Sequence, residues 1–233
     1  MALIEKLVAI GNAIRLKTNT TEALTLDQMS AAIEGIQGGE ECDHSDEDGL
    51  ISGLGSEYRN DRITEVGNYA FYNNTNIVTL SLSNVTKIGQ YAFRLSSALK
   101  NTYFPKLDTV GPQGFRSCTS MEEINLPSLV SGLPSYSFEG CTSLWRADLG
   151  IANSISSYCF KGCSVLVAII LRKPNAVTQL TNINALDATP VANGDGYVYV
   201  PRRLVDEYKV ASNWTTFADQ VRAIEDYPEI TGG

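Results

Sequence analysis

The chain has 233 residues, of which 43% are hydrophobic and 19% are charged, so it carries enough apolar material for a folded core. The chain contains no apolar run of about 18 residues, the length needed to span a bilayer, so membrane insertion is not expected. It also has no stripe of basic residues, so nucleic-acid binding is not expected. The net charge of −8 is concentrated locally, because six acidic residues lie within positions 40–48.

Two amphipathic helices are predicted in residues 1–38. Apolar residues recur there at helical spacing in two stretches: Leu3, Leu7, Ile10 and Ile14, and then Leu26, Met29, Ile33 and Ile36. Thr25 and Gln28 form a capping box at the start of the second helix, and Gly38-Gly39 ends it. The helical hairpin either packs only on itself or also joins copies of the chain into a homo-oligomer.

Part of this hairpin resembles a known module. Ile10-Gly11-Asn12-Ala13-Ile14-Arg15, together with Thr25-Leu26-Asp27-Gln28-Met29, resembles a segment of tail-associated proteins of phages and prophages of Gram-positive bacteria. The resemblance implies a docking role in a virion, with other virion or tail proteins as partners. Since Met1-Ala2-Leu3-Ile4-Glu5 does not begin a secretory signal, we expect synthesis in the cytoplasm and release by lysis.

An acidic linker that also contains the N-terminal cap of the next domain is predicted at 39–57. Its stretch from Asp43 to Gly49 has some features of a calcium loop, but the twelfth position would be Gly55 and not a bidentate Glu. His44 is the only histidine of the chain, and no rigid element places a catalytic partner beside it. No nucleotide-binding or zinc-protease motif occurs either, so we expect no enzyme, no cofactor and no metal site.

An internal repeat with a period of about 22 residues occupies positions 58–182. Five phenylalanines recur in it at a nearly constant step: Phe71, Phe93, Phe115, Phe138 and Phe160. Three apolar columns keep the same step, and they include Ile88, Ile77 and Leu82 in the first units. No single unit can bury its own apolar face, so the repeat predicts a solenoid of stacked coils with one short strand per coil.

A column of small residues runs through the same repeat. Cys118, Cys141 and Cys163 occupy it, and Asn74 and Ser96 continue it toward the N-terminus. We interpret the cysteines as buried free thiols near backbone groups, with disulfides between coils as the alternative. A zinc site is disfavoured because a full repeat separates each of these cysteines from the next, whereas zinc sites typically use CxxC pairs.

These units resemble the BspA-like leucine-rich repeat. The resemblance is carried by Ile88-Gly89-Gln90-Tyr91-Ala92-Phe93 and by Phe138-Glu139-Gly140-Cys141-Thr142-Ser143-Leu144. It implies a leucine-rich-repeat solenoid that binds a partner without catalysis. Pro134 replaces the glycine of the pattern, and the cysteine is missing at Asn74 and Ser96.

Two candidate binding surfaces follow from the alternation within each unit. In Met121-Glu122-Glu123-Ile124-Asn125-Leu126, Ile124 and Leu126 should point inward and Asn125 outward. The outward positions of the strands form the first surface: Thr79, Ser81, Asn101, Tyr103, Glu123, Asn125, Trp145, Arg146 and Asp148. Tyr103, Trp145 and Arg146 are the best candidates for ligand contacts, because such side chains dominate many interfaces.

The second candidate surface is a column of tyrosines: Tyr69, Tyr91, Tyr136 and Tyr158, interrupted by Gln113. Stacked aromatic rings can bind the faces of sugars. However, the BspA-like pattern often carries tyrosine at this position, which favours packing between neighbouring coils as the role of the column.

A C-terminal α/β cap is predicted at 183–233. Alternation from Tyr197 to Val200 indicates a strand, Pro201 ends it, and a helix follows near Leu204. Such a segment covers the end of a solenoid, where the last coil would otherwise expose its core, and Trp214 and Phe217 are expected to be core residues of this cap.

The sequence therefore favours a non-catalytic binding protein. The leading hypothesis is a phage or prophage tail-associated protein that recognises a host-surface protein or glycan and resides in the virion, or outside the cell after lysis. The alternatives are a bacterial BspA-like cell-surface adhesin and a structural spacer in an assembly.

Overall fold

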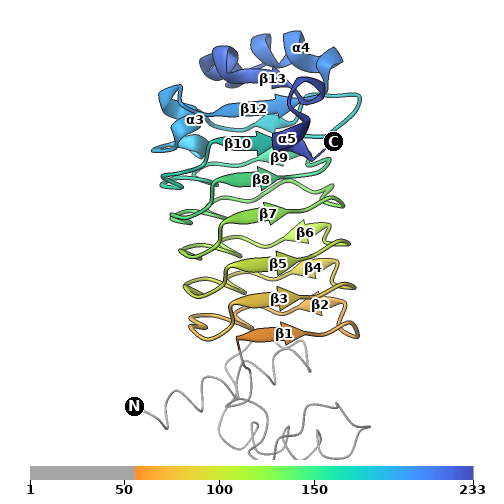
Figure 1. The fold of residues 1–233 in the computed structure, drawn as a ribbon, viewed down its shortest axis with the longest axis vertical. Helices are drawn as coiled ribbons and strands as arrows, with labels where there is room; N and C mark the ends of the chain where they lie inside the picture. Colours follow the sequence, from red (N-terminus) through yellow and green to blue (C-terminus); the bar gives the residue numbers. More distant parts are fainter. Residues whose placement is uncertain (1–55, 233) are drawn as a thin grey trace, which may run out of the picture.

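The computed structural model describes residues 56–232. The predicted helical hairpin at 1–38, and nearly all of the acidic linker, lie outside these residues. Each repeat forms one coil of an elongated stack that runs from β1 to β13 (Figure 1). One face of the stack, here called the strand face, carries eight parallel strands: β1 (Glu57–Arg59), β3 (Thr79–Ser81), β5 (Asn101–Tyr103), β7 (Glu123–Asn125), β8 (Arg146–Asp148), β10 (Ala168–Ile170), β12 (Tyr197–Val200) and β13 (Val221–Ala223).

The strand face consists of two hydrogen-bonded ladders. The first has the order β1-β3-β5, and the second has the order β7-β8-β10-β12-β13. Neighbouring strands pair in register, so that Leu80 lies opposite Thr102 and Ile124 opposite Ala147. The predicted alternation is confirmed, because Ile124 and Leu126 are fully buried and Asn125 is exposed.

The opposite face of the stack carries a second strand in several coils. These two-residue strands are β2 (Glu65–Val66), β4 (Lys87–Ile88), β6 (Thr109–Val110), β9 (Ser154–Ile155) and β11 (Gln179–Leu180). They pair as β2-β4-β6 and β9-β11, and Leu133 bridges to Ile155. The prediction of one strand per coil is therefore wrong, because coils in register also bring their returning segments within hydrogen-bonding distance.

Each coil makes a tight turn after the short strand of the opposite face, as at residues 90–95 between β4 and β5. We call the row of these turns the turn edge. The five repeat phenylalanines lie just inside it, each at most 2% exposed. Their rings stack in register with centroids 4.9 to 5.4 Å apart and planes within 7° of parallel. Backbone bonds join the same positions, as where the Phe115 amide donates to the Ser137 carbonyl at 2.9 Å. The turn edge thus continues across the step between β5 and β7, where the strand-face ladder is interrupted.

The column of small residues hydrogen-bonds the backbone of the preceding coil. The Cys118, Cys141 and Cys163 thiols donate to the carbonyls of Phe93, Phe115 and Phe138 at 3.1 Å each. Ser96 does the same to Phe71 at 2.6 Å, which explains why a hydroxyl can replace a thiol here. The three cysteines are buried and unpaired, as the sequence predicted.

Most of the C-terminal segment lies at the end of the stack beyond β10, and its last residues return to the level of β10 (Figure 1). The predicted strand and following helix are present as β12 and α4 (Val205–Val210). Trp214 and Phe217 are buried as expected, and the Trp214 indole donates to the Thr178 carbonyl at 2.7 Å. The remaining helices are short: η1 (Ile183–Leu186), α3 (Pro190–Asn193), η2 (Arg202–Leu204), η3 (Trp214–Gln220), η4 (Ile224–Asp226) and α5 (Pro228–Thr231).

Replacing Phe115 tests the central ring stack. Phe115→Ala should lower the free energy of unfolding by about 3–5 kcal/mol, because it empties a fully buried site between two stacked rings. Val130→Ala is the control, since Val130 is 43% exposed, and it should cost less than about 0.5 kcal/mol. Urea unfolding followed by circular dichroism measures both. Equal stability of the two variants would contradict the stack.

The buried thiols provide a second test. Burial raises the pKa values of Cys118, Cys159 and Cys163, so at pH 8 these groups are protonated as well as covered. In a Cys42→Ser variant of the full chain, a thiol reagent should label none of the remaining four cysteines until denaturant is added. Rapid labelling in the native state, or a mass that shows a disulfide, would contradict this assignment.

Candidate ligand-binding surfaces

The strand face presents two outward columns, set by the register of the strands. The first begins with Glu57, Thr79 and Asn101, and the second begins with Arg59, Ser81 and Tyr103. On β1, β5 and β7 these side chains are exposed, and on β3 they are half-buried. Tyr103 is 57% exposed and is the large apolar side chain with the most open position on this face. We call the outward residues of β1, β3, β5 and β7 the free strand face.

The C-terminal segment covers part of the strand face beyond β7. Three of the outward residues of β10 and β12, namely Ala168, Ile170 and Tyr199, form a small apolar cluster, whereas the outward Tyr197 stays exposed. Ile224, Tyr227 and Ile230 pack against this cluster, and the rings of Tyr199 and Tyr227 meet edge to face at 5.4 Å. Burial raises the pKa of Tyr199. In Figure 1, α5 lies in front of the strands at the level of β10.

A charged network lies under the edge of this cover. The Asp148 side chain is only 3% exposed and receives Arg172 at 2.7 Å and Arg146 at 3.3 Å. Arg146 also donates through Nε to the Ile230 carbonyl at 2.8 Å, and Arg172 donates to the Thr231 carbonyl. The two guanidinium groups therefore tie the C-terminal segment to the sheet.

This network corrects part of the first predicted surface. Arg146 and Asp148 point outward from β8, as expected, but they are 12% and 3% exposed because residues 230–231 lie over them. They are not available as open ligand contacts. Trp145 stays half-buried beside the exposed Val167. Asn101, Tyr103, Glu123 and Asn125 remain open, although Glu123 also lies 3.5 Å from Arg146.

The predicted tyrosine column lies along the turn edge. Each of its residues adopts a left-handed backbone, with φ between 58° and 64°, a conformation that bulky residues rarely adopt. Tyr69 stacks on Tyr91 at 4.9 Å, and Tyr136 stacks on Tyr158 at 5.1 Å. The rings therefore turn faces toward one another, and mainly their edges and hydroxyl groups are available to a ligand.

Sequence reasoning missed a neighbouring column on the same edge. It lies three positions after the tyrosine column and contains Tyr72, Arg94, Arg116, Glu139 and Lys161. Three of these five are cations, and each lies over a ring of the tyrosine column at 4.9 to 5.6 Å. The signal that could have revealed it was the repeat step, which applies to polar positions as well as to apolar ones.

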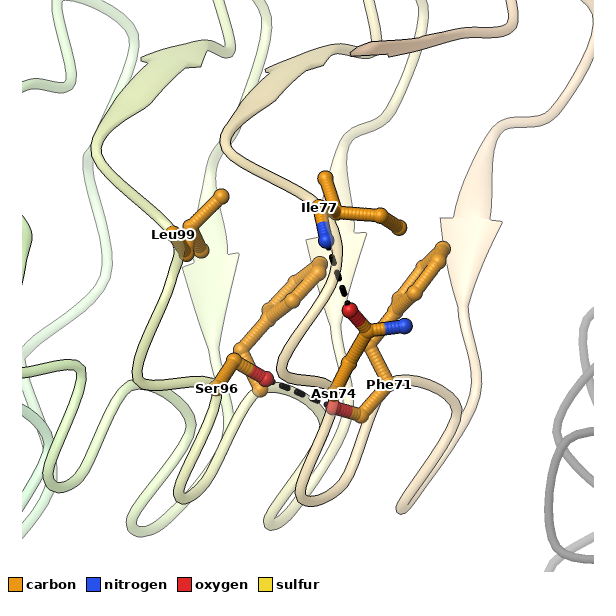
Figure 2. Close-up of a pocket in the computed structure, with 6 residues that line it drawn as sticks. Phe71, Asn74, Ile77, Ser96 and Leu99 are labelled. Carbon is orange, nitrogen blue, oxygen red and sulfur yellow. Dashed lines mark hydrogen bonds between the residues drawn. The ribbon is translucent and has the colours of Figure 1, made fainter. Parts of the chain in front are cut away.

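A hollow between the first two coils is not a ligand cavity. Phe71, Asn74, Ile77, Ser96 and Leu99 line it together with Phe93, as Figure 2 shows. The walls leave no room for a water molecule. Asn74 and Ser96 face inward, where Asn74 accepts from the Ile77 amide at 2.9 Å and Ser96 donates to the Phe71 carbonyl (Figure 2). The Asn74 side-chain oxygen and the Ser96 hydroxyl are thus engaged with the backbone.

Residues 56–232 offer no metal centre, since no three His, Cys, Asp or Glu side chains among them are grouped as ligands. The same residues contain no helix that is long and apolar enough to cross a membrane. His44 and the acidic stretch around it lie outside the described residues. The described residues therefore offer a partner an extended surface and not an enclosed site.

Removing Arg172 tests the covered half of the strand face. Arg172→Met should lower the free energy of unfolding by about 3 kcal/mol, because buried Asp148 loses its principal partner. The control is Arg202→Met, which breaks an exposed ion pair with Asp226 and should change stability little. Urea unfolding measures both. If the two variants are equally stable, Asp148 does not depend on Arg172.

Two solved structures of leucine-rich-repeat proteins are similar to this chain at low sequence identity. A crystal structure of a leucine-rich-repeat protein from Bacteroides ovatus shares 22% identity with a TM-score of 0.47, covering 63% of this chain and 43% of that chain. The chain thus spans less than half the length of that protein. A leucine-rich-repeat protein of T. pallidum shares 24% identity with a TM-score of 0.40, covering 56% of this chain and 75% of that chain. Curated proteins give no significant match.

The repeat itself has a clear family assignment. A family described as "BspA type Leucine rich repeat region" matches residues 64–183 in six copies, which is more than half of the chain. The matched segment holds the phenylalanine stack, the small-residue column, the tyrosine column and the strand face from β3 to β10. The chain belongs to the BspA-type leucine-rich-repeat family.

Proposed function

We propose that this chain is a non-catalytic recognition protein that binds a host-surface protein or glycan through its free strand face. The observation that carries the proposal is the difference between the two halves of that face. The outward residues Ala168, Ile170 and Tyr199 on β10 and β12 are apolar and covered, whereas those on β1, β5 and β7 are exposed and, apart from Tyr103, polar.

The composition of the free strand face suits a reversible contact. It combines both charge signs with amides and one exposed aromatic ring, that of Tyr103. Aromatic residues surrounded by polar neighbours recur as energetic centres of interfaces, because the ring buries area while its hydroxyl keeps a hydrogen bond. Tyr103 lies on β5 and Asn125 on β7, so both stand where the two ladders of the strand face meet.

The biological context of this recognition is a phage or prophage tail. Support comes from the resemblance of residues 10–33 to a tail-associated module, which would dock the chain to the particle or join copies of it. Membership in the BspA-type family fits a bacterial surface adhesin equally well. The two contexts differ in location: a tail protein is found in particles released by lysis, and an adhesin on intact cells.

A double substitution tests the free strand face. Tyr103→Ala with Asn125→Ala removes the exposed ring and an adjacent amide without touching the core. We expect at least a tenfold loss of affinity when labelled full-length protein is titrated onto intact Gram-positive cells and read by flow cytometry, a loss of about 1.4 kcal/mol. The thermal midpoint should not change.

The matched control changes two exposed residues of α4, Lys209→Ala with Val210→Ala, and should bind like the unaltered protein. Binding that survives the loss of Tyr103 and Asn125 but disappears when Tyr91 and Tyr136 are replaced would place the host ligand on the turn edge and refute the strand-face assignment.

A further inference from the structure

The cations of the turn edge differ in whether they have polar partners within the protein. Arg116 has two polar partners: its Nε lies 2.7 Å from the Glu139 carboxylate in an ion pair, and its Nη1 donates to the Gln113 amide oxygen at 2.9 Å. Gln113 in turn donates to the Tyr91 hydroxyl at 3.3 Å. These contacts give partners to Arg116, to Glu139 and to Gln113, the residue that interrupts the tyrosine column.

Arg94 occupies the same column one coil earlier and has no such partners. Its guanidinium lies over the Tyr91 ring at 5.4 Å, and its Nε is enclosed without a hydrogen bond. Within residues 56–232 no carboxylate pairs with it and no side-chain or backbone oxygen accepts from it. A partly buried guanidinium without an acceptor is rare, because enclosed donors normally find partners.

Lys161 repeats this situation at the other end of the column. It is exposed, lies over the Tyr158 ring at 4.9 Å, and has no acidic partner in the described part of the chain. Arg94 and Lys161 are three coils apart, about 15 Å at the usual strand spacing. The column thus carries three cations and one carboxylate on a chain whose net charge is −8.

The neighbouring tyrosines restrict what can bind beside these cations. Since the rings stack on one another, a sugar cannot lie flat on most of them, but the tyrosine hydroxyls form a row of hydrogen-bonding groups along the edge. A row of cations beside a row of hydroxyl groups along an extended edge fits a polymer that carries both anionic groups and hydroxyls.

We propose that the turn edge is a second binding surface, which takes an acidic polysaccharide with its anionic groups on Arg94 and Lys161 and its hydroxyls on the tyrosine column. This surface is distinct from the free strand face and does not depend on the function assigned to that face. Charge complementarity sets its specificity, since an arginine held on a ring binds a carboxylate or sulfate without first losing a partner.

The test is surface plasmon resonance of the full-length protein on immobilised polygalacturonate, with neutral dextran as the comparison polymer and polyglutamate as the comparison polyanion. We expect binding to polygalacturonate alone, weakened as sodium chloride rises from about 50 to about 300 mM, because salt screens exposed charges. Arg94→Gln should weaken binding at least tenfold with an unchanged thermal midpoint.

The charge-matched control is Arg62→Gln, at an exposed arginine between β1 and β2, which should stay within twofold of the unaltered protein. Equal loss in the two variants would show a response to net charge and overturn the site. Absence of binding to polygalacturonate would overturn it as well. Equal binding to polyglutamate would refute the polysaccharide as its ligand. None of these results bears on binding of Tyr103 variants to cells, so the two proposals fail separately.

Discussion

The structure depends on the hydrogen bonds and ring contacts that each coil makes with the next one. A single coil encloses only one layer of apolar side chains, so its core is completed by the layers above and below it. Along the turn edge, amide groups such as those of Phe93 and Phe115 donate to carbonyls one coil further on, and the phenylalanine rings follow the same step. These contacts also fix the left-handed backbone of the tyrosine column, which an isolated loop would not maintain at a cost of about 1–2 kcal/mol per residue.

Repetition in the core leaves the outward positions free to differ from coil to coil. The chain uses this freedom unevenly. At the C-terminal end, the segment 224–231 packs on the apolar outward residues and lies over the ion pairs of buried Asp148, so it covers that part of the strand face. Toward β1 the strand-face columns are mostly polar and exposed or half-buried, and a different pair of columns on the turn edge carries cations over tyrosine rings. One scaffold therefore presents two surfaces of different chemistry, one on the strand face and one on the turn edge.

Sequence periodicity predicted what depends on the repeat and missed what depends on distant parts of the chain. The phenylalanine stack, the inward Ile124 and the unpaired cysteine column follow from the repeat step, because equivalent residues must be neighbours. The covering of Arg146 by Ile230 brings together two residues that are far apart in the sequence, and no local pattern signals that contact. The short strands of the opposite face were missed because so few positions cannot show alternation. The unpartnered Arg94 differs from Arg116 only through Glu139 and Gln113, a difference that becomes visible once coils are stacked.

The most direct measurement of this account is hydrogen exchange of the full-length protein under native conditions. If each coil is stable only through its neighbours, the amides of Phe93, Phe115 and Phe138 should exchange slowly and with similar opening free energies, including across the step where the ladder of the strand face is interrupted. Fast or unrelated exchange at these three positions would show that the coils open independently. That result would contradict a single continuous core, and with it the fixed surfaces on which both recognition proposals depend.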